Sequence, residues 1–149
     1  MSRLWEWALE AWARPGVADA WLALQDAHGQ NAPLLLWVAW AAQDGRAPDL
    51  ARGAALAAAY EAAAGAPLRQ ARRALKPPLP GLGEADQEDL RRRVKAVELD
   101  GERLLMAALA ELAPPAPADR DLRALLVEAA AAYGAPLAPS AFDALLVRL

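Results

Sequence analysis

Hydrophobic positions recur at helical spacing from the beginning of the chain. The first stripe consists of Leu4, Trp5, Ala8, Leu9 and Trp12. Residues three and four apart share one helix face, and Pro15 and Gly16 then interrupt the pattern. The spacing therefore predicts a helix over residues 2–14, with Ser2 as its N-cap.

Two further helices follow at short intervals. The stripe of the second helix is Val17, Trp21, Leu24 and His28, and Gly29 provides a left-handed C-cap. A third helix begins after an Asn31 cap and includes residues 34–40, which are apolar on nearly all sides. We predict helices over residues 17–28 and 31–40, with the third helix at the centre of the fold.

The middle of the chain is rich in alanine and then interrupted by proline. The pattern predicts a fourth helix over residues 48–64 and a short fifth helix over residues 68–75, separated at Gly65, Ala66 and Pro67. A long sixth helix is expected over residues 84–113. Gly101 interrupts its stripe at a cost of about 1 kcal/mol relative to Ala, so we expect a neighbouring backbone to pass close to it.

The last segment follows a proline-rich connector at residues 114–117. Apolar positions predict a pair of helices over residues 119–133 and 140–149. We therefore divide the chain into a helical bundle domain, residues 1–113, and a linker with a C-terminal helix pair, residues 114–149.

Composition favours an all-α fold. The 149 residues include 41 Ala and 26 Leu, no Ile and no Thr, and the only β-branched residues are six Val. Because β-branched side chains fill pleated sheets, a strand-rich fold has little to be built from. We predict a compact, mainly antiparallel helical bundle.

Net charge, apolar runs and cysteine content indicate which partners and which compartment to expect. A net charge of −3 makes nucleic acid an unlikely partner, although residues 66–83 carry four bases and no acid. The longest apolar run is about half of a bilayer span, so we expect no membrane partner. The chain has no Cys and shows no signal-peptide pattern, and we expect a cytoplasmic protein.

Standard catalytic motifs are absent from the sequence. There is no glycine-rich phosphate loop, no nucleophile elbow and no His-Glu-x-x-His, so we predict no catalytic residue, no metal site and no cofactor. The one histidine, His28, lies on an apolar stripe near a helix end, which favours a core or capping role. All six Trp lie within the first 40 residues, and core packing explains them best except for Trp7, which lies off the stripe.

Polar residues on three predicted helices form the strongest candidate cluster. Arg72 falls between two leucines on the apolar side of the fifth helix, and Glu98 and Glu102 lie one turn apart at the edge of the sixth. An Arg–Glu network joining these helices is the simplest interpretation. The alternative is a cavity that binds a small molecule or an anion, because Arg presents a planar fork of donors. The candidate residues are Gln25, Asp26, Arg69, Arg72, Glu98 and Glu102.

Several motifs together resemble a family of short bacterial helical proteins classed as a domain of unknown function. They are Leu-Trp-x-x-Ala-Leu with Pro-Gly-Val at residues 4–17, Leu-Gln-Asp-x-x-Gly-x-Asn at 24–31, Leu-Leu-x-x-x-Trp at 35–40, Pro-Leu-Arg-x-x-Arg-Arg-x-Leu-Lys at 67–76 and Glu-Leu-x-x-Glu at 98–102. Tyr60 stands where that family commonly has Trp. The resemblance implies that the polar candidates belong to one motif set, and it implies no activity.

Function is therefore stated as two hypotheses. The leading one is a non-catalytic cytoplasmic protein-interaction module, with a protein partner or a homodimer interface formed by Trp7, Leu122, Leu126 and Leu145, because the C-terminal apolar pair must be buried somewhere. The alternative is a helical protein, either a binding protein or an enzyme, that binds a small molecule or an anion at the Gln/Asp/Arg/Glu cluster.

Overall fold

The computed structural model describes residues 3–116 and 121–149, and this part of the chain contains helices and loops but no strand. The elements are α1 (Arg3–Trp12), α2 (Val17–His28), α3 (Ala32–Gln43), α4 (Leu50–Tyr60), the π-helical turn η1 (Glu61–Gly65), α5 (Ala66–Ala74), α6 (Glu84–Ala110), α7 (Leu122–Tyr133), the 3-10 turn η2 (Pro139–Phe142) and α8 (Asp143–Leu146). The prediction of an all-α fold is confirmed. The expected N-cap Ser2 and the expected helix start at Asp119 lie outside the described residues.

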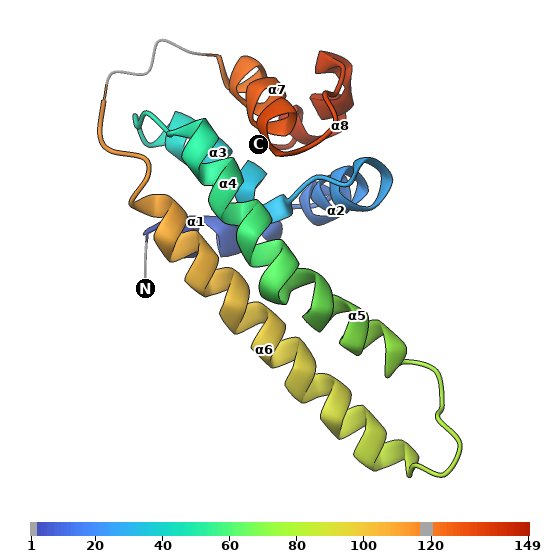
Figure 1. The fold of residues 1–149 in the computed structure, drawn as a ribbon. Coiled ribbons are helices and arrows are strands. Elements are labelled where there is room, and N and C mark those ends of the chain that lie inside the picture. The colour runs from blue at the N-terminus through green and yellow to red at the C-terminus, as the bar shows by residue number, and fades with distance from the viewer. Residues whose placement is uncertain (1–2, 117–120) are drawn as a thin grey trace.

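Helix α3 lies at the centre of the fold, as its apolar sequence predicts. It packs against α1, α2, α4, α6 and α7, and its residues from Ala32 to Ala41 are all buried. The Asn31 side chain caps it by accepting a hydrogen bond from the Leu34 N–H at 2.9 Å. Figure 1 shows α5 and the beginning of α6 extending away from this central region.

Most of the tryptophan side chains pack in the hydrophobic core. Trp5, Trp21, Trp37 and Trp40 are buried, which confirms the core-packing interpretation for these four side chains. His28, by contrast, is exposed at the C-terminal end of α2. Of the core and capping roles expected for His28, the core role is wrong, because the inner stripe of α2 leaves the core before its last turn. The place of His28 in that last turn fits the capping role.

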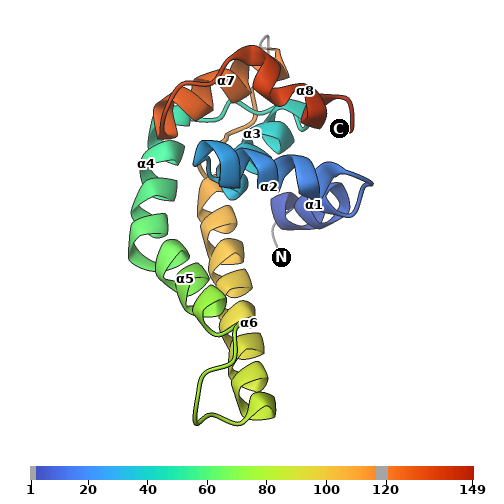
Figure 2. The same cartoon turned by 90° about the vertical axis from the view of Figure 1, so that its right-hand side faces the viewer.

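Helices α4 and α5 form one continuous helical path through η1 (Figure 2). The expected break at residues 65–67 is wrong, since this stretch stays helical. The Ala66 N–H donates to the Glu61 carbonyl, which is the longer bond of a π turn. Pro67 has no N–H and would crowd a regular helix, and the wider turn accommodates it.

Helix α6 runs antiparallel to this path and forms a long hairpin with α5 (Figures 1 and 2). Gln87 is buried and fastens the connecting loop. Its Nε2 donates to the carbonyls of Leu75 and Pro77, each at 2.7 Å, and its Oε1 accepts from the Leu79 N–H at 3.0 Å. The arginines at positions 91–93 form ion pairs with Glu88 and Asp89 of the same helix.

The C-terminal segment packs back onto the bundle. Helix α7 contacts α3 and α4, and one hydrophobic cluster contains side chains from both sides of the connector at residue 114. The helix expected over residues 140–149 is instead η2 followed by the short α8. So short a segment gains few helical bonds, and the burial of Phe142 and Leu145 determines its path instead.

Candidate functional site

A groove of about 670 Å³ lies between two walls of the fold. Helices α1, α2 and α3 form one wall, and α5 and α6 form the other. The groove surface is mainly apolar and includes Trp5, Trp12, Leu22, Leu36, Leu99 and Met106. Its polar lining includes four cations from the second wall, which are Arg69, Arg72, Arg92 and Lys95.

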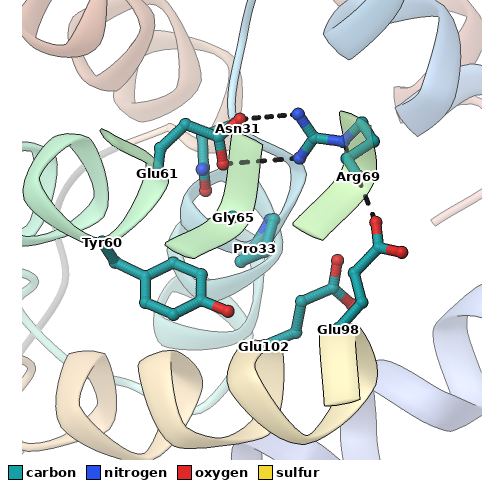
Figure 3. Close-up of a pocket in the computed structure, with 8 residues that line it drawn as sticks. All are labelled: Asn31, Pro33, Tyr60, Glu61, Gly65, Arg69, Glu98 and Glu102. Atoms are coloured by element: carbon teal, nitrogen blue, oxygen red, sulfur yellow. Dashed lines mark hydrogen bonds and ion pairs between the residues drawn. The ribbon is translucent and has the colours of Figure 1, made fainter. Parts of the chain in front are cut away.

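A smaller cavity of about 10 Å³ adjoins the groove, and Figure 3 shows the residues that line this cavity. This is room for about one water molecule. Pro33, Arg69, Glu98 and Glu102 line both spaces, so they form the partition between them. The cavity is otherwise bounded by Asn31, Tyr60, Glu61 and Gly65.

The π turn places Glu61 opposite Arg69. The two side chains form a bidentate pair, with Nη1 to Oε1 at 2.6 Å and Nη2 to Oε2 at 3.3 Å. Gly65 makes this possible, because a Cβ at that position would lie 2.4 Å from the Glu61 carboxylate. The pair holds the Arg69 guanidinium at the edge of the groove and raises its pKa further.

Arg72 makes the second bidentate pair, this time with α6. Its Nε donates to Glu98 Oε2 at 2.5 Å and its Nη2 to Oε1 at 3.3 Å. Arg69 Nε lies 4.0 Å from the same carboxylate. Only 9% of Glu98 is exposed, so two cations offset the cost of burying its charge. The Arg–Glu network expected between the fifth and sixth helices is confirmed.

Among the acids of the site, Glu102 has the most strongly shifted pKa. Burial, and secondarily the nearby charge of Glu98, raise its pKa from 4.5 to about 7. Arg69 and Arg72 oppose this rise only in part. Glu102 therefore changes its charge near neutral pH at the floor of the groove.

Tyr60 inserts its hydroxyl group beside Gly101 of α6. A Cβ at Gly101 would lie 1.9 Å from that oxygen, so the mid-helix glycine accommodates a side chain and not the backbone expected from the sequence. The Tyr60 hydroxyl is buried without a hydrogen-bond partner among the described residues. Burial and the nearby carboxylates, Glu102 first, raise its pKa.

Comparison with known protein families gives one match. A model of a family described as a protein of unknown function, DUF2390, matches residues 3–109. The chain belongs to the DUF2390 family. No curated protein and no solved structure matches this chain. The matched span contains every residue of the groove and of the adjoining cavity, whereas α7 and α8 lie beyond it.

Five of the six polar residues predicted from the sequence meet at the groove of this DUF2390 protein. They are Gln25, Arg69, Arg72, Glu98 and Glu102. The sixth, Asp26, is exposed and lies 3.7 Å from Arg73 in an ion pair at the surface. Sequence reasoning missed Glu61 and did not assign Arg92 or Lys95 to a site.

The four residues expected at a partner surface are placed differently. Leu126 and Leu145 are buried in the core of the same chain, because α7 and α8 fold back onto the bundle. Leu122 is half-buried against that core. Trp7 is half-buried as well, and its indole N–H donates to Gln43 Oε1 at 3.0 Å. The apolar side chains of α7 and α8 are therefore covered by other parts of the same chain in this conformation.

Two other features are absent from residues 3–116 and 121–149. No group of three or more His, Cys, Asp or Glu side chains in these ranges is arranged to hold a metal ion. Over the same ranges, no helix combines the length and apolarity needed to cross a membrane.

Proposed function

We propose that this DUF2390 protein binds a small organic acid with an apolar body in the groove between α1–α3 and α5–α6. The observation that supports this most strongly is the pairing of mainly apolar walls with four cations on one wall. Apolar walls favour a hydrocarbon or aromatic body, and guanidinium and ammonium groups favour a carboxylate or a similar acid group.

The size of the groove fits a ligand of this kind. Sites for small molecules typically enclose about 300–1,000 Å³ with mostly apolar linings and a few polar groups, and the groove has about 670 Å³. Trp5 and Trp12 on α1 present aromatic surface to it, so an aromatic or long alkyl body would have a flat contact face.

Two of the four cations are available to a ligand. Lys95 forms no ion pair with any described residue, and Arg92 pairs only with Asp89 at an exposed surface, where such a pair contributes little. Arg69 and Arg72 are occupied by Glu61 and Glu98. We therefore assign direct contact with the acid group to Lys95 and Arg92, and a supporting role to the two buried pairs.

This proposal includes the Arg–Glu network as part of the site. The network fixes the partition beneath the groove, and the groove remains open above it, so a structural role and a binding role are compatible. The interaction hypothesis that relied on Leu126 and Leu145 loses its main support, because both side chains are buried in their own chain.

Isothermal titration calorimetry with decanoate tests the proposal. We expect saturable binding of decanoate, with decanol binding at least about tenfold more weakly because it lacks the charge. Lys95→Gln should weaken decanoate binding by a similar factor. Lys76→Gln is the matched control, since Lys76 is the other lysine of the chain and lies outside the groove.

A second matched pair separates the site from general charge effects. Arg92 and Arg93 are both exposed and both pair with Asp89, but only Arg92 lines the groove. Arg92→Gln should weaken decanoate binding and Arg93→Gln should not. Equal loss in both variants, or equal affinity for decanoate and decanol, would contradict the proposed site.

A further inference from the structure

Helix α6 carries an apolar stripe on the side away from the groove. Leu90, Val97 and Leu104 follow one another at intervals of seven residues, and they are 47%, 52% and 70% exposed. At 100° per residue they share one face, whereas the groove residues Leu99 and Met106 lie about half a turn away. Exposed leucines and valines aligned over about four turns of helix indicate a contact surface.

The stripe has the periodicity of a helix-pairing seam. With Val94, Gly101 and Ala108, the three residues complete an unbroken alternation of three- and four-residue steps, which is the spacing that pairs helices. Within the described chain, Val94 and Gly101 are half-buried, and Gly101 lies against Tyr60 of α4. Leu90, Val97 and Leu104 form the outer half of the seam and extend away from that contact.

Charges beside the stripe are complementary to one another. Arg93 and Asp100 lie on the same edge of the seam, again seven residues apart. Asp100 forms no ion pair with any described residue, and Arg93 pairs only with Asp89 on its own helix, at the surface. In a parallel pair of identical helices, this edge of one seam faces the opposite edge of the other, so Arg93 and Asp100 would not meet. Antiparallel helices bring the two like edges together and place Arg93 against Asp100.

We propose that a second copy of this chain packs on α6 in antiparallel orientation, with the two-fold axis at Val97. Val97 then meets the partner subunit's Val97, and Leu90 meets the partner subunit's Leu104. Arg93 lies beside the partner subunit's Asp100, and the symmetry repeats this pair on the other side. The apolar contacts and the ion pairs are therefore formed in the same register, because both sets of residues repeat every seven positions.

The interface is independent of the proposed ligand site, because it uses the opposite side of α6. It is also small, since it involves one exposed helix face, so the dimer should form in a concentration-dependent equilibrium. Sedimentation velocity from micromolar to millimolar protein should show the sedimentation coefficient rising from monomer to dimer. A monomer throughout that range would overturn the proposal.

The absence of cysteine from the chain permits a direct test of register. Val97→Cys should be cross-linked to its own copy by a short bismaleimide, because the two thiols meet at the axis. Leu104→Cys, on the same stripe, should not link to itself, but a mixture with Leu90→Cys should give a mixed dimer. Val147→Cys, which is 78% exposed and outside α6, is the control for random collision. Equal yields for positions 97 and 147 would contradict the proposed contact, and efficient self-linking at position 104 would contradict the antiparallel register.

Charge reversal tests the ion pairs without removing apolar surface. Arg93→Asp should weaken association, because it places acid against acid. Combining it with Asp100→Arg in the same chain should restore association to about the wild-type level. Circular dichroism of each variant checks that the fold is retained. Failure of the double variant to recover, with the helix content unchanged, would overturn the assigned pairing.

Discussion

Ionisation of Glu102 should lower the stability of the fold as the pH rises from about 4.5 to about 7. The pKa of Glu102 is about 7 in the folded chain and 4.5 in an unperturbed Glu, mainly because burial disfavours the charged form. At a pH between these two pKa values, Glu102 keeps its proton in the folded state and has lost it in the unfolded state. The stabilisation from this group is therefore complete below about pH 4.5, declines up to about pH 7, and is absent above it.

The size of this effect follows from the two pKa values. Each pKa unit corresponds to about 1.4 kcal/mol, so ionised Glu102 costs on the order of 3 kcal/mol of unfolding free energy above neutral pH. Glu102→Gln keeps a neutral group of the same size and should avoid this loss. The stability of the variant relative to wild type should therefore increase by about that amount as the pH rises from about 5 to about 8.

Urea denaturation followed by tryptophan fluorescence measures the difference at each pH. Glu10→Gln is the control, because Glu10 is an exposed carboxylate of α1 outside the groove. It should change the unfolding free energy by the same small amount at both ends of the range. If the difference between Glu102→Gln and wild type were also independent of pH, the reasoning about burial would be refuted.

Three further substitutions test the packing around the site, each by the same denaturation measurement. Arg72→Ala should lower the unfolding free energy by about 2–4 kcal/mol, because Glu98 would keep a buried charge with weaker compensation, and a loss below about 0.5 kcal/mol would contradict the pair's role. Gly101→Ala should destabilise by about 1–3 kcal/mol despite its higher helix propensity, since its Cβ meets the Tyr60 hydroxyl, and the cost should fall in a Tyr60→Phe background. Gln87→Ala should cost about 1–3 kcal/mol by releasing the loop between α5 and α6, and unchanged stability would mean that its three hydrogen bonds contribute nothing.

Local signals explain which helices could be predicted from the sequence. Asn31 and Gly29 mark ends that depend on their own side chain or backbone conformation, and the structure places a side-chain cap at Asn31 and a left-handed glycine at Gly29. The joint between α4 and α5 was not predictable in this way. Gly65 and Pro67 indicate a break locally, but the π turn is supported by distant packing, in which Tyr60 fits against Gly101.

The residues of the candidate site also divide into those with a local signal in the sequence and those without one. Arg72, Glu98 and Glu102 could be predicted because each lies at the edge of an apolar stripe on a regular helix. Glu61 could not, since the π turn places it opposite Arg69, and a pattern of 3.6 residues per turn does not reveal that turn. Lys95 lies among alternating charges that indicate a solvated surface, and only the placement of α1–α3 opposite it creates a groove.

The tryptophan indole signals provide the most direct test of the proposed binding groove. The chain has six Trp, and each indole N–H gives its own peak in a ¹⁵N-correlated NMR spectrum. Trp5 and Trp12 line the groove, whereas Trp21 and Trp37 are fully buried elsewhere in the core. Titration with decanoate should shift the peaks of Trp5 and Trp12 saturably and leave those of Trp21 and Trp37 in place. Saturable shifts of Trp21 and Trp37 without Trp5 and Trp12, or no shift in any of the six peaks, would contradict the assignment of this groove as a site for apolar organic acids.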